Sequence, residues 1–166
     1  MKIVSLRDIS NKIYSGGTPN TKNKNYWDGD YNWLSSGETR NPFINKTERT
    51  ITKEGILNSS TKLAKAGNII VASAGQGFTR GQTSLLKIDT YINQSLICID
   101  VNQKIAIPEY IFYFLYANYD LLRLISDSSA IRGSLTTKII SEIEIKLPIK
   151  SVQQHIVDTI DSFLIF

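Results

Sequence analysis

Amide, hydroxyl and lysine side chains gather around a glycine-rich turn near the N-terminus of this 166-residue chain. Residues 15–19 read SGGTP, and two tryptophans, Trp27 and Trp33, follow shortly after them. Lysine ammonium groups and small polar side chains are groups with which proteins hold DNA phosphates, whereas buried tryptophans stiffen a segment. The turn therefore predicts a rigid, cationic contact surface, with the tryptophans as its scaffold, formed by Thr18, Asn20, Lys22 and Lys24.

Two later segments have the same chemistry. Residues 74–82 (AGQGFTRGQ) and 131–138 (IRGSLTTK) each combine glycine with cations, hydroxyls or amides. Glycine lets a backbone approach a phosphate closely, and amide and hydroxyl side chains can also contact base edges. The alternative is an ordinary hairpin loop and a solvated connection. On the first interpretation we expect phosphate or base contacts from Thr79, Arg80, Gln82, Arg132, Ser134, Thr136 and Lys138, and a near-base contact from Glu38.

The charge of the chain is unevenly distributed. Residues 1–87 hold thirteen Lys and Arg against six Asp and Glu, a balance of +7. Residues 88–166 hold six against nine, a balance of −3. A basic half favours a nucleic-acid or phosphate-bearing partner, although a lysine-rich solvated surface explains the charge alone equally well.

Three catalytic alternatives are weaker. Asp127, Glu144 and Lys146 approximate the D…ExK pattern of Mg²⁺-dependent nucleases, but half-exposed strands produce ExK by chance. Residues 41–43 (NPF) lack the second proline of the N-P-P-[YF] tetrapeptide of DNA methyltransferases. The single histidine, His155, lies in a predicted helix, which disfavours nucleophilic catalysis. We expect no catalytic residue, no metal site and no cofactor in this chain.

The single cysteine, Cys98, lies in the apolar run 96–99, where we expect it to be a core residue. One cysteine cannot form an internal disulfide, which fits a reducing compartment. The N-terminus lacks the apolar segment of a signal peptide, and no stretch approaches the roughly 20 apolar residues of a membrane span. We expect a soluble, cytoplasmic protein.

Turn residues divide the first half of the chain into short segments. β-branched residues between Gly, Asp or Asn predict three strands, over 68–74, 83–88 and 95–101. Pro108 before an apolar pattern predicts a helix over 109–126, and polar–apolar alternation predicts a strand over 142–147. Together these elements predict an α/β (α+β-like) domain in which a helix packs on a mixed or antiparallel twisted sheet.

The last segment predicts an amphipathic helix over 151–165. Ser151 and Gln154 have the spacing of a capping box. One apolar stripe has heptad spacing and a second lies beside it, so that one face can pack on the domain and the other on a partner. We expect this helix to begin a coiled-coil arm whose partner interface is formed by Val152, Ile156, Ile160 and Phe163.

The order of these motifs resembles the target recognition domain of the specificity (S) subunit of Type I restriction–modification systems. The resemblance covers nearly the whole chain, although Ile149 replaces the second proline usual in the family. Each motif is weak alone, but several in the family's order are specific. They are residues 4–9, 15–19, 26–29, 32–34, 50–52, Gly55, 58–60, 69–74, Gly81, 92–95, Gly133, 147–148, Gln153 and Ile156.

The resemblance implies that residues 1–148 form a DNA target recognition domain without catalysis of its own. Residues 149–166 would begin the conserved dimerisation and spacer helix. Family subunits normally have two such domains and two long helices, so this chain corresponds to half of one and would read one half of a bipartite DNA site.

The implied partners are double-stranded DNA, the methyltransferase (modification) subunit, the restriction subunit, and a second copy or second half-subunit held through the terminal helix. S-adenosylmethionine and ATP would bind to the other subunits. A protein-interaction module without a DNA role, built around the terminal helix, is the remaining hypothesis, and the basic first half argues against it.

Overall fold

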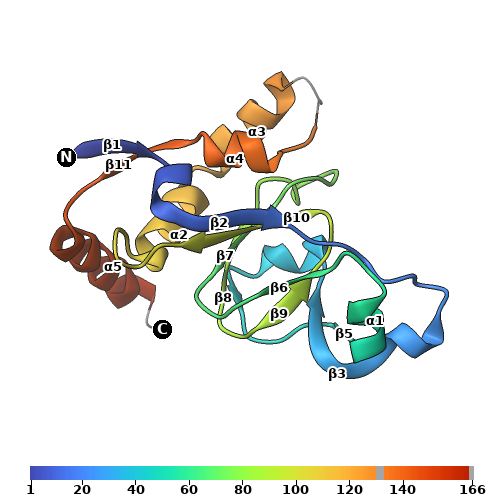
Figure 1. Ribbon diagram of the computed structural model, residues 1–166. Coiled ribbons are helices and arrows are strands. Elements are labelled where there is room, and N and C mark those ends of the chain that lie inside the picture. The colour runs from blue at the N-terminus through green and yellow to red at the C-terminus, as the bar shows by residue number, and fades with distance from the viewer. Residues whose placement is uncertain (130–132, 165–166) are drawn as a thin grey trace.

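The computed structural model describes residues 1–129 and 133–164 of the chain. Figure 1 shows helices gathered at the left and top around one sheet, and a second sheet that extends to the lower right. The predicted fold class is confirmed, because antiparallel and mixed sheets are combined with packed helices.

The central sheet has five strands in the order β2–β10–β7–β8–β4. Neighbours are antiparallel, except that β4 is parallel to β8. β-branched residues make up three of the four residues of β7 and three of the six of β10, which favours extended backbone. The strands are β2 (Ser10–Ser15), β10 (Leu96–Val101), β7 (Ile69–Ala72), β8 (Thr83–Leu86) and β4 (Phe43–Ile44).

A second sheet has four strands in the order β5–β3–β9–β6, and β3 and β9 are its parallel pair. A separate two-stranded antiparallel sheet pairs β1 with β11. The strands of the four-stranded sheet are β5 (Arg49–Ile51), β3 (Trp27–Leu34), β9 (Thr90–Ile92) and β6 (Lys62–Ala64). Those of the two-stranded sheet are β1 (Lys2–Ser5) and β11 (Glu144–Leu147).

Helices cover the central sheet and extend from its end. In the described residues the α-helices are α1 (Lys53–Leu57), α2 (Pro108–Ala117), α3 (Tyr119–Ser128), α4 (Thr137–Ser141) and α5 (Lys150–Leu164). Short 3-10 turns are η1 (Arg7–Ile9), η2 (Lys24–Tyr26) and η3 (Ser36–Arg40). Helix α2 packs against both β8 and α5, so it connects the C-terminal helix to the sheet.

Strand β7 is buried on both faces. Ile69 and Val71 pack in the larger core with residues of α2, whereas Ile70 and Ala72 pack in a second core with residues of the four-stranded sheet. Successive side chains of a strand point to opposite faces, so this one run contributes to two cores. This double burial explains why the segment shows no polar–apolar alternation.

The predicted strands are confirmed as β7, β8, β10 and β11, each somewhat shorter than expected. The single helix expected over 109–126 is wrong, because α2 and α3 are separate helices that meet at Asn118. The Asn118 side chain donates a hydrogen bond to the carbonyl oxygen of Phe114 at 2.7 Å. A side chain that takes a helix carbonyl in this way competes with the regular backbone hydrogen bonds.

Helices α1 and α4 were not predicted from the sequence. Each begins after a threonine whose hydroxyl accepts a hydrogen bond from a backbone N–H three residues later. The pairs are Thr52 with Gly55 and Thr136 with Ile139, both at 3.1 Å. Threonine is a favoured N-cap, but five residues are too few to show an apolar periodicity.

The predicted capping box at Ser151 is wrong, because α5 begins one residue earlier, at Lys150. The Gln154 amide donates to Asp158 at 2.8 Å instead of bonding to the start of the helix. Among the helices whose residues the structure describes, none has the length and apolar character needed to cross a bilayer.

Candidate nucleic-acid interface

The loop between β2 and η2 lies tightly against the four-stranded sheet. A Cβ on Gly16 would lie 2.0 Å from the Ile92 carbonyl oxygen. A Cβ on Gly17 would lie 2.1 Å from the hydroxyl oxygen of Ser60. Neither position has room for a side chain, so the two glycines of the SGGTP turn are required by close approach.

Two buried tryptophans hold the same loop. The rings of Trp27 and Trp33 meet edge to face, with centroids 5.0 Å apart. Trp33 Nε1 donates to the Gly17 carbonyl oxygen at 3.3 Å, and Trp27 Nε1 donates to that of Asn20 at 3.1 Å. The Arg49 guanidinium lies 3.6 Å from the Trp27 ring centroid. The interpretation of the tryptophans as scaffold is confirmed.

The four candidate residues on this loop differ in exposure. Asn20, Lys22 and Lys24 are exposed, whereas Thr18 is half-buried and donates to the Gln94 side chain at 2.5 Å. Asn20 Oδ1 accepts a hydrogen bond from the Lys22 backbone N–H at 3.0 Å, which closes a local turn. The lysines therefore belong to a fixed turn, which packs next to α1 at the far end of the molecule (Figure 1).

The loop between β7 and β8 (residues 73–82) has a conformation that depends on glycine. Positive φ angles occur at Gly75 (122°), Gly77 (67°) and Gly81 (90°). The Tyr119 hydroxyl donates to the carbonyl oxygen of Phe78 at 2.7 Å, and Arg123 Nη1 donates to that of Arg80 at 2.9 Å. Helix α3 thus fixes the loop, which projects beside it in Figure 1.

Arg80 is held inside the protein. Its side chain is only 13% exposed, and Nη2 donates to Asp127 Oδ1 at 2.7 Å. A Cβ on Gly133 would lie 3.1 Å from Arg80 Nη1, so the arginine also touches the start of the 133–138 segment. Arg80 therefore ties three segments together and has its charge balanced by Asp127. Arg132, the other predicted cation nearby, lies outside the described residues.

The remaining predicted contact residues of these two loops differ in exposure and in their hydrogen-bond partners. Thr79 and Gln82 are half-buried, and Gln82 Oε1 accepts a hydrogen bond from Thr39 Oγ1 at 3.0 Å. Thr136 caps α4, as described above, so its hydroxyl has a structural partner. Ser134 is half-buried in the same segment.

Lys138 lies away from Arg80. It lines a hollow of about 360 Å³ together with Arg7 and Lys12. Lys12 also lines a neighbouring hollow of about 350 Å³ with Lys62 and Lys65. Arg7, Lys12, Lys62 and Lys65 were not predicted, since they come from distant positions in the chain and no local motif connects them.

Glu38 serves the fold. It is 4% exposed, and Oε2 accepts hydrogen bonds from the Ser35 backbone N–H at 2.8 Å and the Ser35 hydroxyl at 3.0 Å. Oε1 accepts a third from the Glu48 backbone N–H at 2.7 Å. The arrangement is a capping box at the start of η3, and the Ser35-x-x-Glu38 spacing was the signal for it. Burial therefore speaks against the predicted near-base contact.

The residues of the nuclease alternative lie on different elements. Asp127 pairs with Arg80 at the end of α3. Glu144 and Lys146 lie on β11, opposite β1. Figure 1 shows β11 at the left of the molecule and α3 at the top. The structure therefore gives no common site to these three side chains.

Helix α5 packs on the domain through one face. Val157 is buried, while Ile156 and Ile160 are half-buried. Val152 and Phe163, the other two predicted interface residues, are 41% and 77% exposed. An apolar edge of the helix therefore remains open to a partner.

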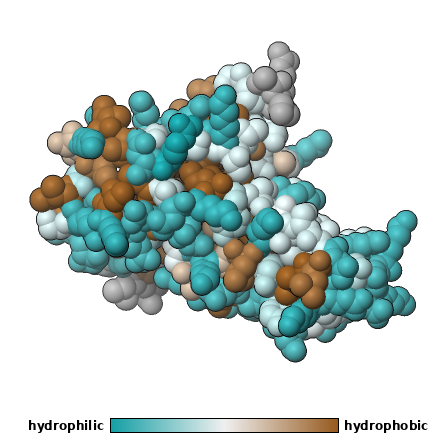
Figure 2. All heavy atoms as spheres, viewed as in Figure 1, coloured by the Kyte–Doolittle hydropathy of each residue, from teal (hydrophilic) through white to brown (hydrophobic). Residues whose placement is uncertain are grey.

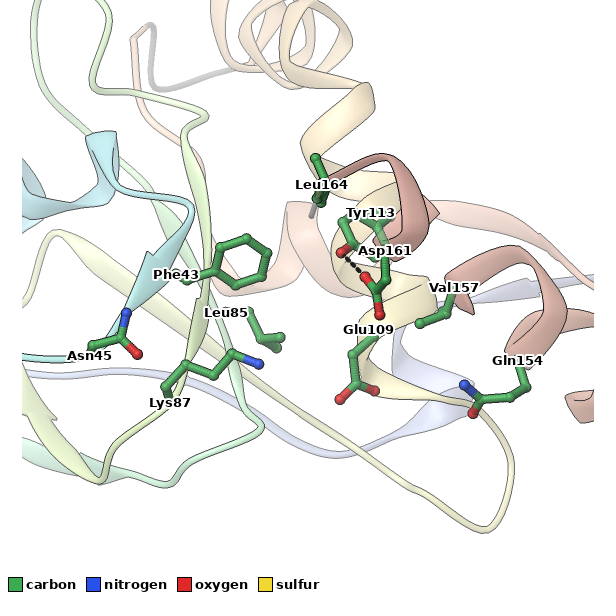
Figure 3. A pocket seen from close by; sticks show the side chains of 10 residues that line it. All are labelled: Phe43, Asn45, Leu85, Lys87, Glu109, Tyr113, Gln154, Val157, Asp161 and Leu164. Atoms are coloured by element: carbon green, nitrogen blue, oxygen red, sulfur yellow. Dashed lines mark hydrogen bonds between the residues drawn. The ribbon is translucent and has the colours of Figure 1, made fainter. Parts of the chain in front are cut away.

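A hollow of about 550 Å³ lies beside α5, between α2 and the edge of the central sheet (Figure 3). Phe43 and Leu85 line one side of it, and Val157 lines the other. The Tyr113 hydroxyl donates a hydrogen bond to Asp161. Burial and this carboxylate raise the pKa of Tyr113 above its ordinary value, so the hydroxyl keeps the proton that joins α2 to α5.

The two ends of the molecule differ in surface character. On the face shown in Figure 2, hydrophobic residues gather at the left, where β1, β11 and α5 lie in Figure 1. Further hydrophobic patches lie near the centre and toward the lower right, and the far right edge is hydrophilic. The turn that bears Lys22 and Lys24 therefore lies far from the open edge of α5 (Figure 1).

Comparison with protein families and curated sequences gives consistent matches. The model of the Type I restriction modification DNA specificity domain matches residues 1–165. The chain is 28% identical over 155 residues to the specificity subunit of the Type I restriction enzyme EcoR124I/EcoR124II of Escherichia coli. It is 27% identical over 168 residues to that of the enzyme MjaIX of Methanocaldococcus jannaschii. These alignments cover 92% and 97% of the chain but 38% and 37% of the relatives, so the chain spans well under half of their length.

Solved structures share the fold. The HsdS subunit from Thermoanaerobacter tengcongensis superposes with a TM-score of 0.74 at 16% identity, over 97% of this chain and 36% of that one. A chain from a study of assembly and conformational transition of the type I R-M system gives a TM-score of 0.76 at 16% identity, over 98% and 38%. At this identity the likeness concerns the fold alone.

Proposed function

The chain belongs to the family of Type I restriction modification DNA specificity domains, and from this membership we propose that it recognises one half of a bipartite duplex DNA site. The observation that carries the proposal is the pair of fixed, glycine-containing loops, residues 16–26 at the far right of Figure 1 and residues 73–82 beside α3. Loops held in one conformation lose little conformational entropy when they bind.

The first layer of the proposed contact is with phosphates. Lys22 and Lys24 are exposed on a turn that two tryptophans hold in place. Asn20 and Thr18 lie on the same turn and supply polar groups. Lys138 is an exposed cation elsewhere on the surface. Such contacts fix the position of a protein on the duplex without reading its sequence.

The second layer is with base edges. Gln82 and Thr79 lie on the loop that α3 fixes, and Ser134 lies on the adjoining segment. A glutamine can pair with the N6 and N7 atoms of adenine in the major groove. Glu38 is buried, Arg80 is paired with Asp127 and Thr136 caps α4, so we assign these three to the support of this layer instead of the DNA contact.

The proposed domain binds DNA and performs no chemistry. Methyl transfer and cleavage would belong to a modification subunit and a restriction subunit, which would hold S-adenosylmethionine and ATP. Residues 149–166 would begin the helix through which a second copy or half-subunit assembles. The exposed Val152 and Phe163 support this assignment, because they leave an apolar edge of α5 uncovered.

The function is tested by the salt dependence of duplex binding. The logarithm of the binding constant falls with the logarithm of salt concentration by roughly 0.9 for each phosphate contacted. Replacing Lys22 and Lys24 by alanine should weaken binding and reduce that slope by about 2. Fluorescence anisotropy with a labelled random-sequence duplex, between low and moderate salt, measures both quantities.

A matched control removes two lysines from the opposite end of the molecule. Lys2 and Lys146 are exposed on β1 and β11, so the K2A/K146A variant loses the same charge. We expect its slope to equal that of the parent. Equal slopes for all three proteins would show that the turn does not contact phosphates, and a parent that binds no duplex would contradict the function itself.

A further inference from the structure

Phe78 is an aromatic side chain that the protein leaves in water. It is 81% exposed, in the loop between β7 and β8. A phenyl ring in this position forgoes the stabilisation that burial gives. Single exposed apolar residues are common on protein surfaces, so its meaning depends on what surrounds it.

The backbone around Phe78 is fixed. The Tyr119 hydroxyl bonds to its carbonyl oxygen at 2.7 Å, and the turn after it is closed by the Gln82 N–H to the Thr79 carbonyl oxygen at 3.0 Å. Gly77, directly before it, has a φ of 67°, and a Cβ there would meet nothing within 4 Å. Gly77 is therefore favoured by its positive φ angle, since a side chain at this position would have enough space. The loop therefore holds the ring away from the domain.

The ring has open space behind it. Phe78 lines a hollow of about 340 Å³ together with Tyr116, Tyr119 and Gln82. Tyr116 is itself 51% exposed. Aromatic walls beside an amide suit planar, hydrogen-bonding groups such as nucleobases.

The arginines next to the hollow make contacts within the protein. Arg40 forms an exposed ion pair with Glu48 at 3.0 Å. Arg123 Nη1 donates to the Arg80 carbonyl oxygen at 2.9 Å, and its guanidinium lies 5.6 Å from the Tyr119 ring centroid. Three of the eight residues that line the hollow are aromatic, which suits contact with base faces.

On the basis of the proposed DNA-recognition function, we propose that Phe78 is inserted between neighbouring base pairs of the bound DNA. Apolar side chains used in this way separate a base step and bend the duplex. Flexible pyrimidine–purine steps, TA and CA/TG, separate most easily. Phe78 therefore selects a flexible step at one position of the half-site, without a hydrogen bond to any base.

The test uses a duplex that the parent protein selects from a random-sequence pool, and copies of it with one mismatch at each position in turn. A mismatch at the inserted step removes part of the cost of unstacking. The parent should bind one such copy several-fold more tightly than the paired duplex. The F78A variant should bind the paired duplex about tenfold more weakly, as for loss of one stacking contact, with an unchanged salt slope. Phe78→Trp should retain both properties.

Ile3→Ala is the control, because Ile3 is an exposed apolar residue, 61% accessible, on β1 instead of the loop that bears Phe78. It should behave as the parent does. The inference is overturned if F78A keeps the affinity and mismatch profile of the parent, or if it loses only binding to a methyltransferase subunit. If the parent selects no duplex from the pool, the proposed DNA-recognition function is contradicted too. Failure of the Phe78 insertion and failure of the proposed function therefore give different results.

Discussion

Glu38 combines a full negative charge with almost complete burial. Three hydrogen bonds, two from Ser35 and one from the Glu48 backbone, replace the water that its carboxylate loses. Hydrogen bonds to a buried charge are among the stronger ones, and removing the acceptor leaves the donors unpaired. The side chain therefore joins η3 to the segment before β5.

Replacing Glu38 by alanine should lower the free energy of unfolding by about 3 kcal/mol, because three donors lose their acceptor. Urea denaturation followed by circular dichroism measures the change. Glu48→Ala is the control, since the Glu48 carboxylate forms only an exposed ion pair with Arg40. Its effect should stay below about 0.5 kcal/mol. If both variants lost a similar amount of unfolding free energy, the structural role assigned to Glu38 would be contradicted.

Cys98 should be chemically inert in the folded protein. Burial is the main cause that raises the pKa of its thiol to about 12. At pH 8 the reactive thiolate is then on the order of one molecule in ten thousand. Iodoacetamide should leave the native chain unmodified, as followed by mass spectrometry, and label it fully in urea. Native labelling as fast as that of the unfolded chain would place Cys98 at the surface.

Single side chains were predicted well where their role depends on local sequence. The apolar neighbours of Cys98 predict its burial, and the polar residues around Lys22 and Lys24 predict that these two lysines are exposed. The internal partners of Arg80 and Glu38, which are Asp127 and the Glu48 backbone, could not be predicted because the fold alone brings them together. A charged residue in a polar segment has the same appearance whether it contacts a ligand or an internal partner.

At the scale of elements, Gln153 fixes the start of α5. It is fully buried, Nε2 donates to the Pro148 carbonyl oxygen and Oε1 accepts from the Ile107 backbone N–H, both at 2.8 Å. One side chain thus joins the last helix to the entry of α2. The sequence analysis gave Gln153 a place in a motif but no structural role.

Gln153→Ala should cost about 2 kcal/mol of unfolding free energy, because two buried backbone groups lose their partners. Thermal and urea unfolding of the variant measure this. The neighbouring Gln154→Ala provides the control, since Gln154 is exposed and bonds only along its own helix. We expect a change there within about 0.5 kcal/mol. A stable Q153A variant would mean that α5 is held by its apolar contacts alone.

The helices and strands that could be predicted are those marked by residues within their own segment. Pro108 marks the first turn of α2, and β-branched runs mark β7, β8 and β10. The division into three sheets was not predicted, because pairings such as β1 with β11 join residues at opposite ends of the chain. The break between α2 and α3 at Asn118 was not predicted, because the apolar pattern continues through it and the hydrogen bond from the Asn118 side chain to Phe114 is not visible in the sequence.

The turn that bears Lys22 and Lys24 and the open edge of α5 lie at opposite ends of the molecule (Figure 1). Val152 and Phe163 extend this edge beyond the half-buried Ile156 and Ile160. If α5 begins an assembly helix, charges placed on its open edge should oppose association without disturbing the fold. The domain's contact with DNA should be independent of that edge.

The V152E/F163E variant should therefore shift the chain from self-associated to monomeric, as measured by sedimentation equilibrium. Leu121→Glu with Leu124→Glu is the control, because these exposed residues of α3 carry the same change outside α5. It should leave the mass in solution unaltered. A parent that is already monomeric, or a V152E/F163E variant with the mass of the parent, would contradict assembly through this edge.

The pairing of β1 with β11 sets Lys2 directly across from Leu147. The chain therefore enters and leaves the body of the domain at two paired strands, and the residues between them form that body. Helix α2 lies within that body and also holds α5, so an exchange of residues that keeps α5 in place would be confined to loops outside the contacts of Gln153 with Ile107 and of Tyr113 with Asp161, such as residues 16–26 and 73–82.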